Sequence, residues 1–229
     1  DRVKRDIIRL YDKDFIRIDP TGKASAMFKA IPSELTRNSS RYQVASVTEN
    51  GRANRLLETI TNMGESMVVN MAYHANDPGP GMAFHKDTST FKMFVGDTGL
   101  FVTLAFWDKE FTDNVIYQKL LTDKLSKDLG YVYENVVAQM LVASGNELYY
   151  HTFPTESGKH RYEVDFLIPD GDKVVPIEVK SSGYKAHVSL DAFCTKFSSR
   201  VSRPYLIYTK DLRKEGNLLY LPVYMTMFL

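Results

Sequence analysis

A chain of 229 residues with a hydrophobic fraction of 44% and a charged fraction of 25% has the composition of a globular protein, which excludes the disordered, collagen-like and low-complexity classes. Its formal net charge of +1 excludes a globally basic protein, so any nucleic-acid surface must arise from local segregation of charge. Cys194 is the only cysteine, and the sequence has neither a signal peptide nor an apolar run of about 18 residues. We therefore expect a cytoplasmic protein with no membrane partner, and the helix-like start at Asp1 suggests a fragment of a longer chain.

The first predicted elements are helices. Residues 1–17 place apolar side chains at helical spacing among charges, which predicts an amphipathic helix. Residues 23–31 predict a second helix, whose continuation Pro32 blocks. Residues 49–64 predict a third helix with one apolar face, and Gly64 is placed to end it.

A β-hairpin follows the helices. Residues 66–73 predict a strand, residues 76–81 are rich in Asp, Pro and Gly and predict a turn, and residues 91–101 can pair back. Helices followed by a hairpin predict a winged-helix-like module over residues 1–128, in which a helix at 112–127 leads to the next domain. Such modules bind DNA or other proteins, and both alternatives stay open.

The second half alternates strands with helices, which predicts an α/β (α+β) domain over residues 129–229 with a sheet covered by helices. The predicted elements in chain order are a helix at 131–143, strands at 149–153, 162–168 and 174–180, a helix at 190–197, and strands at 204–210 and 219–225. No internal repeat is visible in this order.

Acidic residues fall on one face of two consecutive strands. The alternation of a strand puts Glu163 and Asp165 on the same side of the first, and Glu178 and Lys180 on the same side of the second. The turn at 169–172 can reverse the chain between them. If the strands pair antiparallel around that turn, Asp165 and Glu178 approach each other.

Carboxylates on strands that otherwise suit a sheet centre are costly unless they pair or hold a cation. A hard divalent ion such as Mg²⁺ takes oxygen ligands and keeps several waters, so Asp165 and Glu178 with a carbonyl group suffice to hold it. Lys180 beside them can position a water molecule or offset charge on a phosphoryl oxygen. A Glu–Lys ion pair without any metal, or a solvent-facing edge strand, explains the same residues.

Glu134 is a further candidate acid. The positions three, four and seven residues later are Val137, Ala138 and Leu141, so Glu134 lies on an apolar side of its helix, where a carboxylate needs a partner. The alternative is an acid near a helix N-terminus, where the helix dipole favours negative charge.

The order of these motifs resembles that of the PD-(D/E)XK nuclease superfamily, the fold of many restriction enzymes. A helix glutamate is followed by E-V-D-F at 163–166 and by I-E-V-K-S at 177–181. More narrowly, most of the chain, strongly over residues 130–182 and loosely elsewhere, resembles the C-terminal region of a group of bacterial and archaeal AAA-type ATPases, in which a winged helix precedes a nuclease-like domain of unknown function. The resemblance implies a restriction-endonuclease-like mixed sheet flanked by helices, a Mg²⁺ or Mn²⁺ ion, DNA as the substrate, and an ATPase domain in the same full-length polypeptide.

The resemblance also implies a role for each residue that matches the motif. Asp165 and Glu178 match the metal-binding acids, and the backbone carbonyl of Val179 matches a further ligand. Glu134 matches the helix acid that reaches the metal directly or through water, and Lys180 matches the catalytic lysine.

Two functions stay open at this point. One is a metal-dependent phosphodiesterase acting on DNA, with Asp165, Glu178, Glu134 and Lys180 as its catalytic residues. The other is a catalytically inert DNA- or protein-binding regulatory module of the ATPase. An ion pair between Lys180 and Glu178 in the metal position favours the second function.

The leading proline of the motif is Val164 here, a substitution common in the superfamily.

Basic residues gather late in the chain. Residues 173–214 hold nine Lys or Arg against three acids, a local net charge of +6. The candidate nucleic-acid contacts are Lys185, Lys196, Arg200 and Arg203, together with Arg161 before the first acidic strand. A solvated helix with its flanking loops accounts for the same charges.

An ATP site is not expected in this chain. Residues 21–25 resemble a phosphate-binding loop, yet Arg17 and Ala24 stand where such a loop needs glycine and a hydroxyl residue. The five histidines show no metal-ligand spacing. Nucleases of this fold often cut as dimers, so an oligomer stays open.

Overall fold

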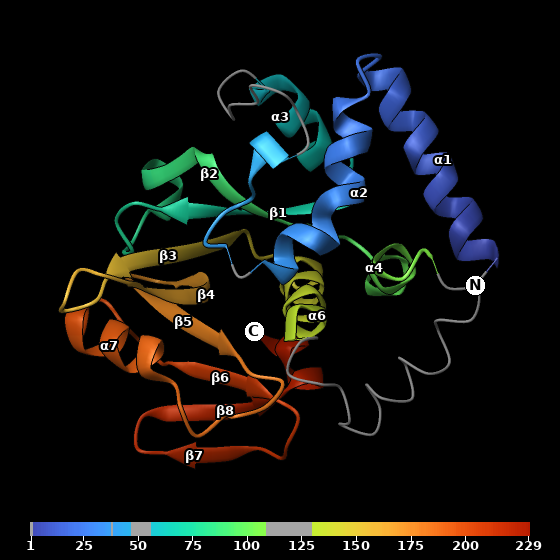
Figure 1. Cartoon of the computed structure of the whole chain (residues 1–229). Helices are drawn as coiled ribbons and strands as arrows, with labels where there is room; N and C mark the ends of the chain where they lie inside the picture. Colours follow the sequence, from blue (N-terminus) through green and yellow to red (C-terminus); the bar gives the residue numbers. More distant parts are fainter. Residues whose placement is uncertain (1, 38, 47–55, 109–129) are drawn as a thin grey trace. The chain divides into compact units, whose positions relative to one another are not determined.

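The computed structural model of the chain describes residues 2–37, 39–46, 56–108 and 130–229 (Figure 1). They form two compact units, of which unit 1 takes residues from 1–71 and 89–135 and unit 2 takes residues from 72–88 and 136–229. The predicted domain boundary at 128/129 borders a segment outside this description, so it stays a prediction.

Unit 1 is built mainly of helices that bury their apolar faces against one another. These are α1 (Arg2–Ile18), α2 (Lys23–Thr36), η1 (Val44–Ser46), α3 (Leu57–Glu65) and α4 (Thr98–Ala105). Gly22 reverses the chain between α1 and α2 with a φ of 73°, a left-handed conformation that suits glycine because it lacks a Cβ. Phe15 of α1 and Phe28 of α2 then meet in the core with ring centroids 5.2 Å apart. The first two predicted helices are confirmed.

Pro32 does not end α2, so this part of the prediction is wrong. The helix contains Pro32 and runs on to Thr36. Phe28 and Ile31, in the turn before the proline, are fully buried, and this packing offsets the hydrogen bond that the missing N–H removes. Thr36 Oγ1 donates a hydrogen bond to the Pro32 carbonyl at 2.6 Å and thereby steadies the last turn.

The hairpin strands are β1 (Val69–Ala75) and β2 (Lys86–Val95), which are neighbours in the sheet. The predicted second strand is wrong beyond Val95, because the strand ends there and α4 begins at Thr98. The Asp97 carboxylate accepts a hydrogen bond from Leu100 N at 2.8 Å, which makes Asp97 the N-cap of α4.

Two predicted helical segments fall partly or wholly outside the described residues. Helix α3 confirms the predicted third helix from Leu57 onward, although it includes Gly64, the predicted end, and runs to Glu65. Residues 49–55 are not described. The predicted helix at 112–127 lies entirely outside the described residues.

The strands form an eight-stranded mixed sheet in the order β2-β1-β3-β4-β5-β6-β8-β7. Beyond the hairpin, its strands are β3 (Leu148–Pro154), β4 (Arg161–Asp170), β5 (Lys173–Val179), β6 (Tyr205–Tyr208), β7 (Arg213–Glu215) and β8 (Leu218–Pro222). The remaining helices are α6 (Gly130–Ala143), α7 (Val188–Lys196), η3 (Met82–His85) and η5 (Val223–Phe228). The predicted α/β class is confirmed, as are its strands, except that the predicted strand at 219–225 is wrong beyond Pro222, where η5 begins. β7 is an additional short strand of three exposed residues.

Strand register in unit 2 sets which side chains share a face. β4 and β5 form an antiparallel hairpin, whereas β5, β6 and β8 run parallel. Glu178 of β5 pairs with Leu206 of β6, and Leu206 pairs with Tyr220 of β8. These three residues therefore lie in one row across the sheet, on the same face.

Helix α7 packs on strands β4 and β5 (Figure 1). Its Phe193 is fully buried in a core cluster with Phe153, Leu167 and Val174. In the part of the chain that the structure describes, no helix combines the length and the apolar character that crossing a membrane requires.

Candidate active site

Asp165 and Glu178 face each other across the β4–β5 hairpin. Phe166 pairs with Ile177, so one further step along both strands pairs Asp165 with Glu178 on one face of the sheet. Asp165 is also tied to β5 directly, because its Oδ2 accepts a hydrogen bond from Val179 N at 2.8 Å. The antiparallel pairing that the sequence predicts around the turn is confirmed.

Glu178 is a buried carboxylate with only part of its hydrogen-bonding capacity used. The residue is 5% exposed, and its Oε1 lies 2.7 Å from Lys180 Nζ. Its Oε2 is buried and accepts no hydrogen bond from any residue that the structure describes. Burial, together with the nearby negative charges of Asp165 and Glu163, raises the pKa of Glu178 to about 7 although the Lys180 ammonium opposes the shift.

This arrangement fits a hard divalent cation. Two carboxylates point to one side of the hairpin, and a cation beside them would satisfy the unpaired Oε2 of Glu178 and relieve its repulsion with Asp165. Among the described residues, no group of three or more His, Cys, Asp or Glu side chains is placed to hold a metal. A cation here would therefore rest on two carboxylates and take its remaining ligands from water and backbone oxygen.

Lys180 follows directly after β5 and is held at the end of the strand. Its backbone N donates a hydrogen bond to Ile207 O at 2.8 Å, which continues the pairing with β6. The side chain is 29% exposed, so the ammonium reaches both Glu178 and solvent. The ion pair with Glu178 is the arrangement that we associated with an inert site.

Glu134 lies on α6 and is half-buried. Val137, Ala138 and Leu141, on the following turns, are fully buried, as the apolar spacing predicts. Glu134 belongs to unit 1, whereas Asp165, Glu178 and Lys180 belong to unit 2. Its convergence with the other three residues stays a prediction.

The residue after Glu134 has a structural role that sequence reasoning missed. Asn135 is fully buried, and its Oδ1 accepts a hydrogen bond from Val95 N at 2.9 Å. Its Nδ2 donates to Val95 O at 3.0 Å and to Thr98 Oγ1 at 3.1 Å. The side chain thus pairs with the backbone at the end of β2 as a neighbouring strand would. The available signal was an amide side chain among the apolar residues of this helix.

Residues 129–225 match the family model of a domain of unknown function (DUF4143). This DUF4143 region begins just before α6 and contains Glu134, both hairpin carboxylates and Lys180. No curated protein and no solved structure matches the chain.

Three of the five predicted nucleic-acid residues, all in the DUF4143 region, are engaged by the protein itself. Lys196 Nζ lies 5.1 Å from the Phe153 ring centroid, and Arg161 donates hydrogen bonds to the Thr152 side chain and carbonyl. Arg200 forms an ion pair with Asp77 of the hairpin loop. The other two, Lys185 and Arg203, are exposed. Their contact with nucleic acid stays a prediction.

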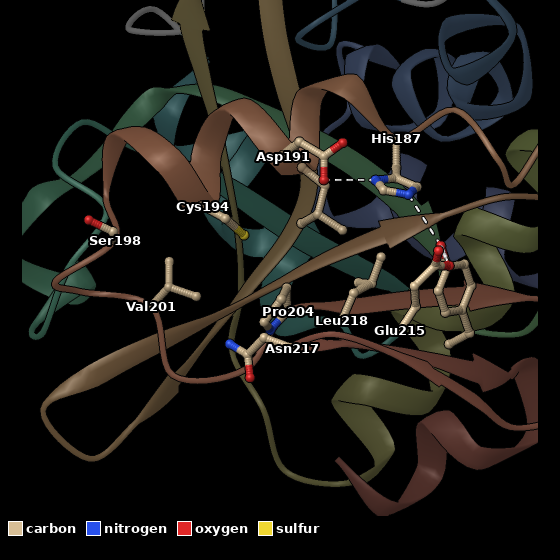
Figure 2. A pocket seen from close by; sticks show the side chains of 11 residues that line it. His187, Asp191, Cys194, Ser198, Val201, Pro204, Glu215, Asn217 and Leu218 are labelled. Carbon is tan, nitrogen blue, oxygen red and sulfur yellow. Dashed lines mark hydrogen bonds and ion pairs between the residues drawn. The ribbon is translucent and has the colours of Figure 1, made fainter.

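The DUF4143 region also contains a pocket that sequence reasoning missed. It has a volume of about 450 Å³ and lies between α7, the segment that follows this helix, and the β7–β8 hairpin (Figure 2). His187 Nδ1 lies 2.8 Å from Asp191 Oδ1, and His187 Nε2 lies 3.2 Å from the Tyr220 hydroxyl. The Tyr220 hydroxyl also donates to Glu215 Oε2 at 3.2 Å, which completes a chain of polar groups.

The signal for this pocket was weak but present. His187 and Asp191 are four residues apart, so they share one face of α7. Tyr220 and Glu215 reach them only because β8 lies beside β6 in the sheet, a parallel pairing that sequence spacing does not specify.

Proposed function

We propose that this protein is a metal-dependent phosphodiesterase that acts on DNA through a PD-(D/E)XK-like site. The observation that carries the proposal is the pairing of Asp165 with Glu178 across one hairpin, with the buried Oε2 of Glu178 left without a hydrogen bond from a described residue. An unpaired buried carboxylate oxygen is costly in a purely structural role, whereas a site that binds a cation requires it.

The proposed roles follow from position and from the resemblance. Asp165 and Glu178 would hold Mg²⁺ or Mn²⁺, with the Val179 carbonyl as a further ligand and Glu134 as a supporting acid. A bound divalent cation supplies Lewis-acid stabilisation of charge on the phosphoryl group. The Lys180 ammonium, already beside the carboxylates, donates hydrogen bonds that orient a water molecule or neutralise a phosphoryl oxygen.

The wider setting is also part of the proposal. The DUF4143 domain is commonly found in the C-terminal regions of AAA-type ATPases, which supports an ATPase domain elsewhere in the same polypeptide. The winged-helix-like module over residues 1–128 rests on the predicted order of helices and hairpin and on the resemblance. We expect no ATP binding by this chain, and a heat of ATP binding in calorimetry would contradict that expectation.

A second function is favoured by one observation. The Lys180–Glu178 ion pair, at 2.7 Å, satisfies one carboxylate oxygen without any metal. A DNA- or protein-binding regulatory module with an inert site would keep this pair at all times. In the enzyme, a divalent cation competes with Lys180 for Glu178.

Cleavage of supercoiled plasmid and branched DNA in Mg²⁺ or Mn²⁺ tests the proposal. We expect metal-dependent nicking that falls by at least ~100-fold in Asp165→Asn and in Lys180→Ala. Asp172→Asn makes the same charge change on the exposed turn of the same hairpin and should keep full activity.

The outcome that contradicts the enzyme is an absence of nicking, or nicking that persists in both site variants. DNA binding by fluorescence anisotropy then separates the two functions. Unchanged binding by Asp165→Asn without any cleavage supports the regulatory module.

A further inference from the structure

The pocket beside α7 is not used by the proposed nuclease chemistry. Its volume of about 450 Å³ is in the range of small-ligand sites. Leu190, Val201, Pro204 and Leu218 form an apolar wall, and Figure 2 shows the last three on the segments facing α7. The cavity lies entirely within unit 2.

Two carboxylates line the same cavity and are open to solvent. The side chains of Asp191 and Glu215 are 62% and 60% exposed. Asp191 uses Oδ1 to contact His187, and Glu215 uses Oε2 to contact Tyr220 and Arg213. Within the described part of the chain, the second oxygen of each carboxylate accepts no hydrogen bond. The pocket therefore presents two acceptor oxygens next to an apolar wall.

The charge of the lining selects against anions. Arg213 is paired with Glu215 and does not line this cavity, and no Lys or Arg is among the lining residues, so a phosphate or carboxylate ligand would be repelled by the Asp191 carboxylate. Nucleophilic chemistry is also disfavoured. Burial and the nearby charge of Asp191 raise the pKa of Cys194 to about 11, so this thiol is neutral and serves as part of the wall.

The protein itself shows that one of these carboxylates, Glu215, binds a guanidinium group. The Arg213 guanidinium forms an ion pair with Glu215 and lies 5.0 Å from the centroid of the Tyr220 ring. A guanidinium group therefore suits both the acid and the aromatic ring at this site. Asn217, which also lines the cavity, adds an amide oxygen that can accept from a bound N–H group.

We infer that this pocket binds a guanidinium or alkylammonium group carried on an apolar stem. The stem lies along the wall that includes Leu190 and Leu218, and the cation lies between the Asp191 and Glu215 carboxylates. The ligand is either a free small cation or the side chain of an Arg or Lys in a peptide, which share this chemistry. The inference goes beyond the proposed nuclease function and does not depend on it.

Cys194 provides a local readout, because it is the only cysteine in the chain and it lines the pocket. The rate of its alkylation by N-ethylmaleimide at pH 8 is followed by mass spectrometry. We expect n-butylguanidine to slow the reaction at least ~3-fold on saturation, while the neutral analogue n-butylurea and inorganic phosphate leave the rate unchanged. A blocked Ala-Arg-Ala peptide separates the two ligand sources: slowing at lower concentrations of the peptide than of n-butylguanidine identifies a peptide side chain, and slowing by n-butylguanidine without slowing by the peptide identifies a free cation.

Two sets of variants test whether the protection of Cys194 depends on the pocket carboxylates. In the Asp191→Asn, Glu215→Gln double variant, two isosteric changes at exposed positions, the guanidinium should no longer protect Cys194. Glu156→Gln, at an exposed acid in the β3–β4 turn, is the matched control and should keep the protection. The inference is overturned if n-butylurea or phosphate protects equally, if protection survives in the double variant, or if neither cation slows the reaction.

Discussion

Two buried glutamates, one in each unit, show opposite ways of keeping a carboxylate inside a protein. Glu34 is 4% exposed and Glu178 is 5% exposed, so burial alone does not distinguish them. Glu34 accepts hydrogen bonds on both oxygens, from Arg37 and Ser46 on Oε1 and from Gln43 N on Oε2. Glu178 has one partner, Lys180, and its Oε2 has none among the described residues.

The difference separates a structural acid from a candidate functional one. Glu34 fixes the segment after α2 to the helix, and each of its three hydrogen bonds replaces one that water would make. Glu178 instead carries an unpaired oxygen and lies near Asp165 and Glu163, both negatively charged. Such a site is destabilising by itself and becomes favourable when a cation is bound.

The largest effect is expected at Glu34. Glu34→Ala removes three hydrogen bonds and leaves Gln43 N and Arg37 without their acceptor, so we expect the free energy of unfolding to fall by about 4 kcal/mol. Urea denaturation measures this loss. Glu58→Ala, at an exposed glutamate on α3, is the control and should change stability by less than about 0.5 kcal/mol. A loss of stability below about 1 kcal/mol for Glu34→Ala would contradict the structural role of this residue.

His151 extends the comparison to a buried base. Burial is the main cause that lowers its pKa from 6.5 to about 4, and the positive charges of Lys196 and Arg161 add to the shift. His74, stacked on it at 5.3 Å, also faces it. Between pH 6.5 and pH 4 the unfolded chain binds more protons at this position than the folded chain, so stability falls as the pH is lowered through this range.

The titration of His151 is expected to lower the free energy of unfolding by about 3 kcal/mol between pH 7 and pH 4. His151→Gln cannot titrate, so its urea midpoint should fall less steeply with acid than that of the wild type, even if its stability at pH 7 is lower. Parallel slopes for the two proteins would contradict the assignment.

Glu178→Gln should change the free energy of unfolding in the opposite direction to Glu34→Ala. The neutral amide removes the repulsion with Asp165 and the burial of a charge, at the expense of the ion pair with Lys180. We expect the variant to be more stable than the wild type by about 1–2 kcal/mol at pH 8 in chelator-treated buffer. A destabilised Glu178→Gln would mean that the ion pair with Lys180 is structural, as Glu34 is.

The smallest effect is stabilisation by a divalent cation. Mg²⁺ or Mn²⁺ at roughly five times its dissociation constant should stabilise the wild type by about 1 kcal/mol, seen as a rise in the melting temperature. Asp165→Asn and Glu178→Gln should lose this rise, and Asp172→Asn should keep it. An equal rise in all four proteins would indicate nonspecific binding.

Local periodicity was sufficient to predict the β4–β5 hairpin and the face of α6. Alternation along each strand fixed which side Asp165 and Glu178 occupy, and the short turn left one plausible register. The spacing of Val137, Ala138 and Leu141 likewise fixed the buried side of α6. These features depend on neighbours in the sequence, and for that reason a single sequence reveals them.

Features that depend on distant partners could not be predicted. Pro32 remains inside α2 because Phe28 and Ile31 are buried by other helices, and tertiary packing of this kind overrides a local helix breaker. Asn135 finds its hydrogen-bond partners, the N–H and the carbonyl of Val95, forty residues earlier. The pocket beside α7 needs the parallel pairing of β6 with β8, which brings Tyr220 to His187.

The row formed by Glu178, Leu206 and Tyr220 sets a fixed distance between the β4–β5 hairpin and the pocket. Adjacent strands are about 4.8 Å apart, so two steps place the backbone of the hairpin acid and that of the pocket tyrosine about 10 Å apart. Backbone hydrogen bonds fix this length, so surface substitutions leave it unchanged. A bivalent compound that joins a metal-chelating group to a guanidinium through a spacer of matching length would therefore gain avidity from both ends, and shorter or longer spacers would lose it.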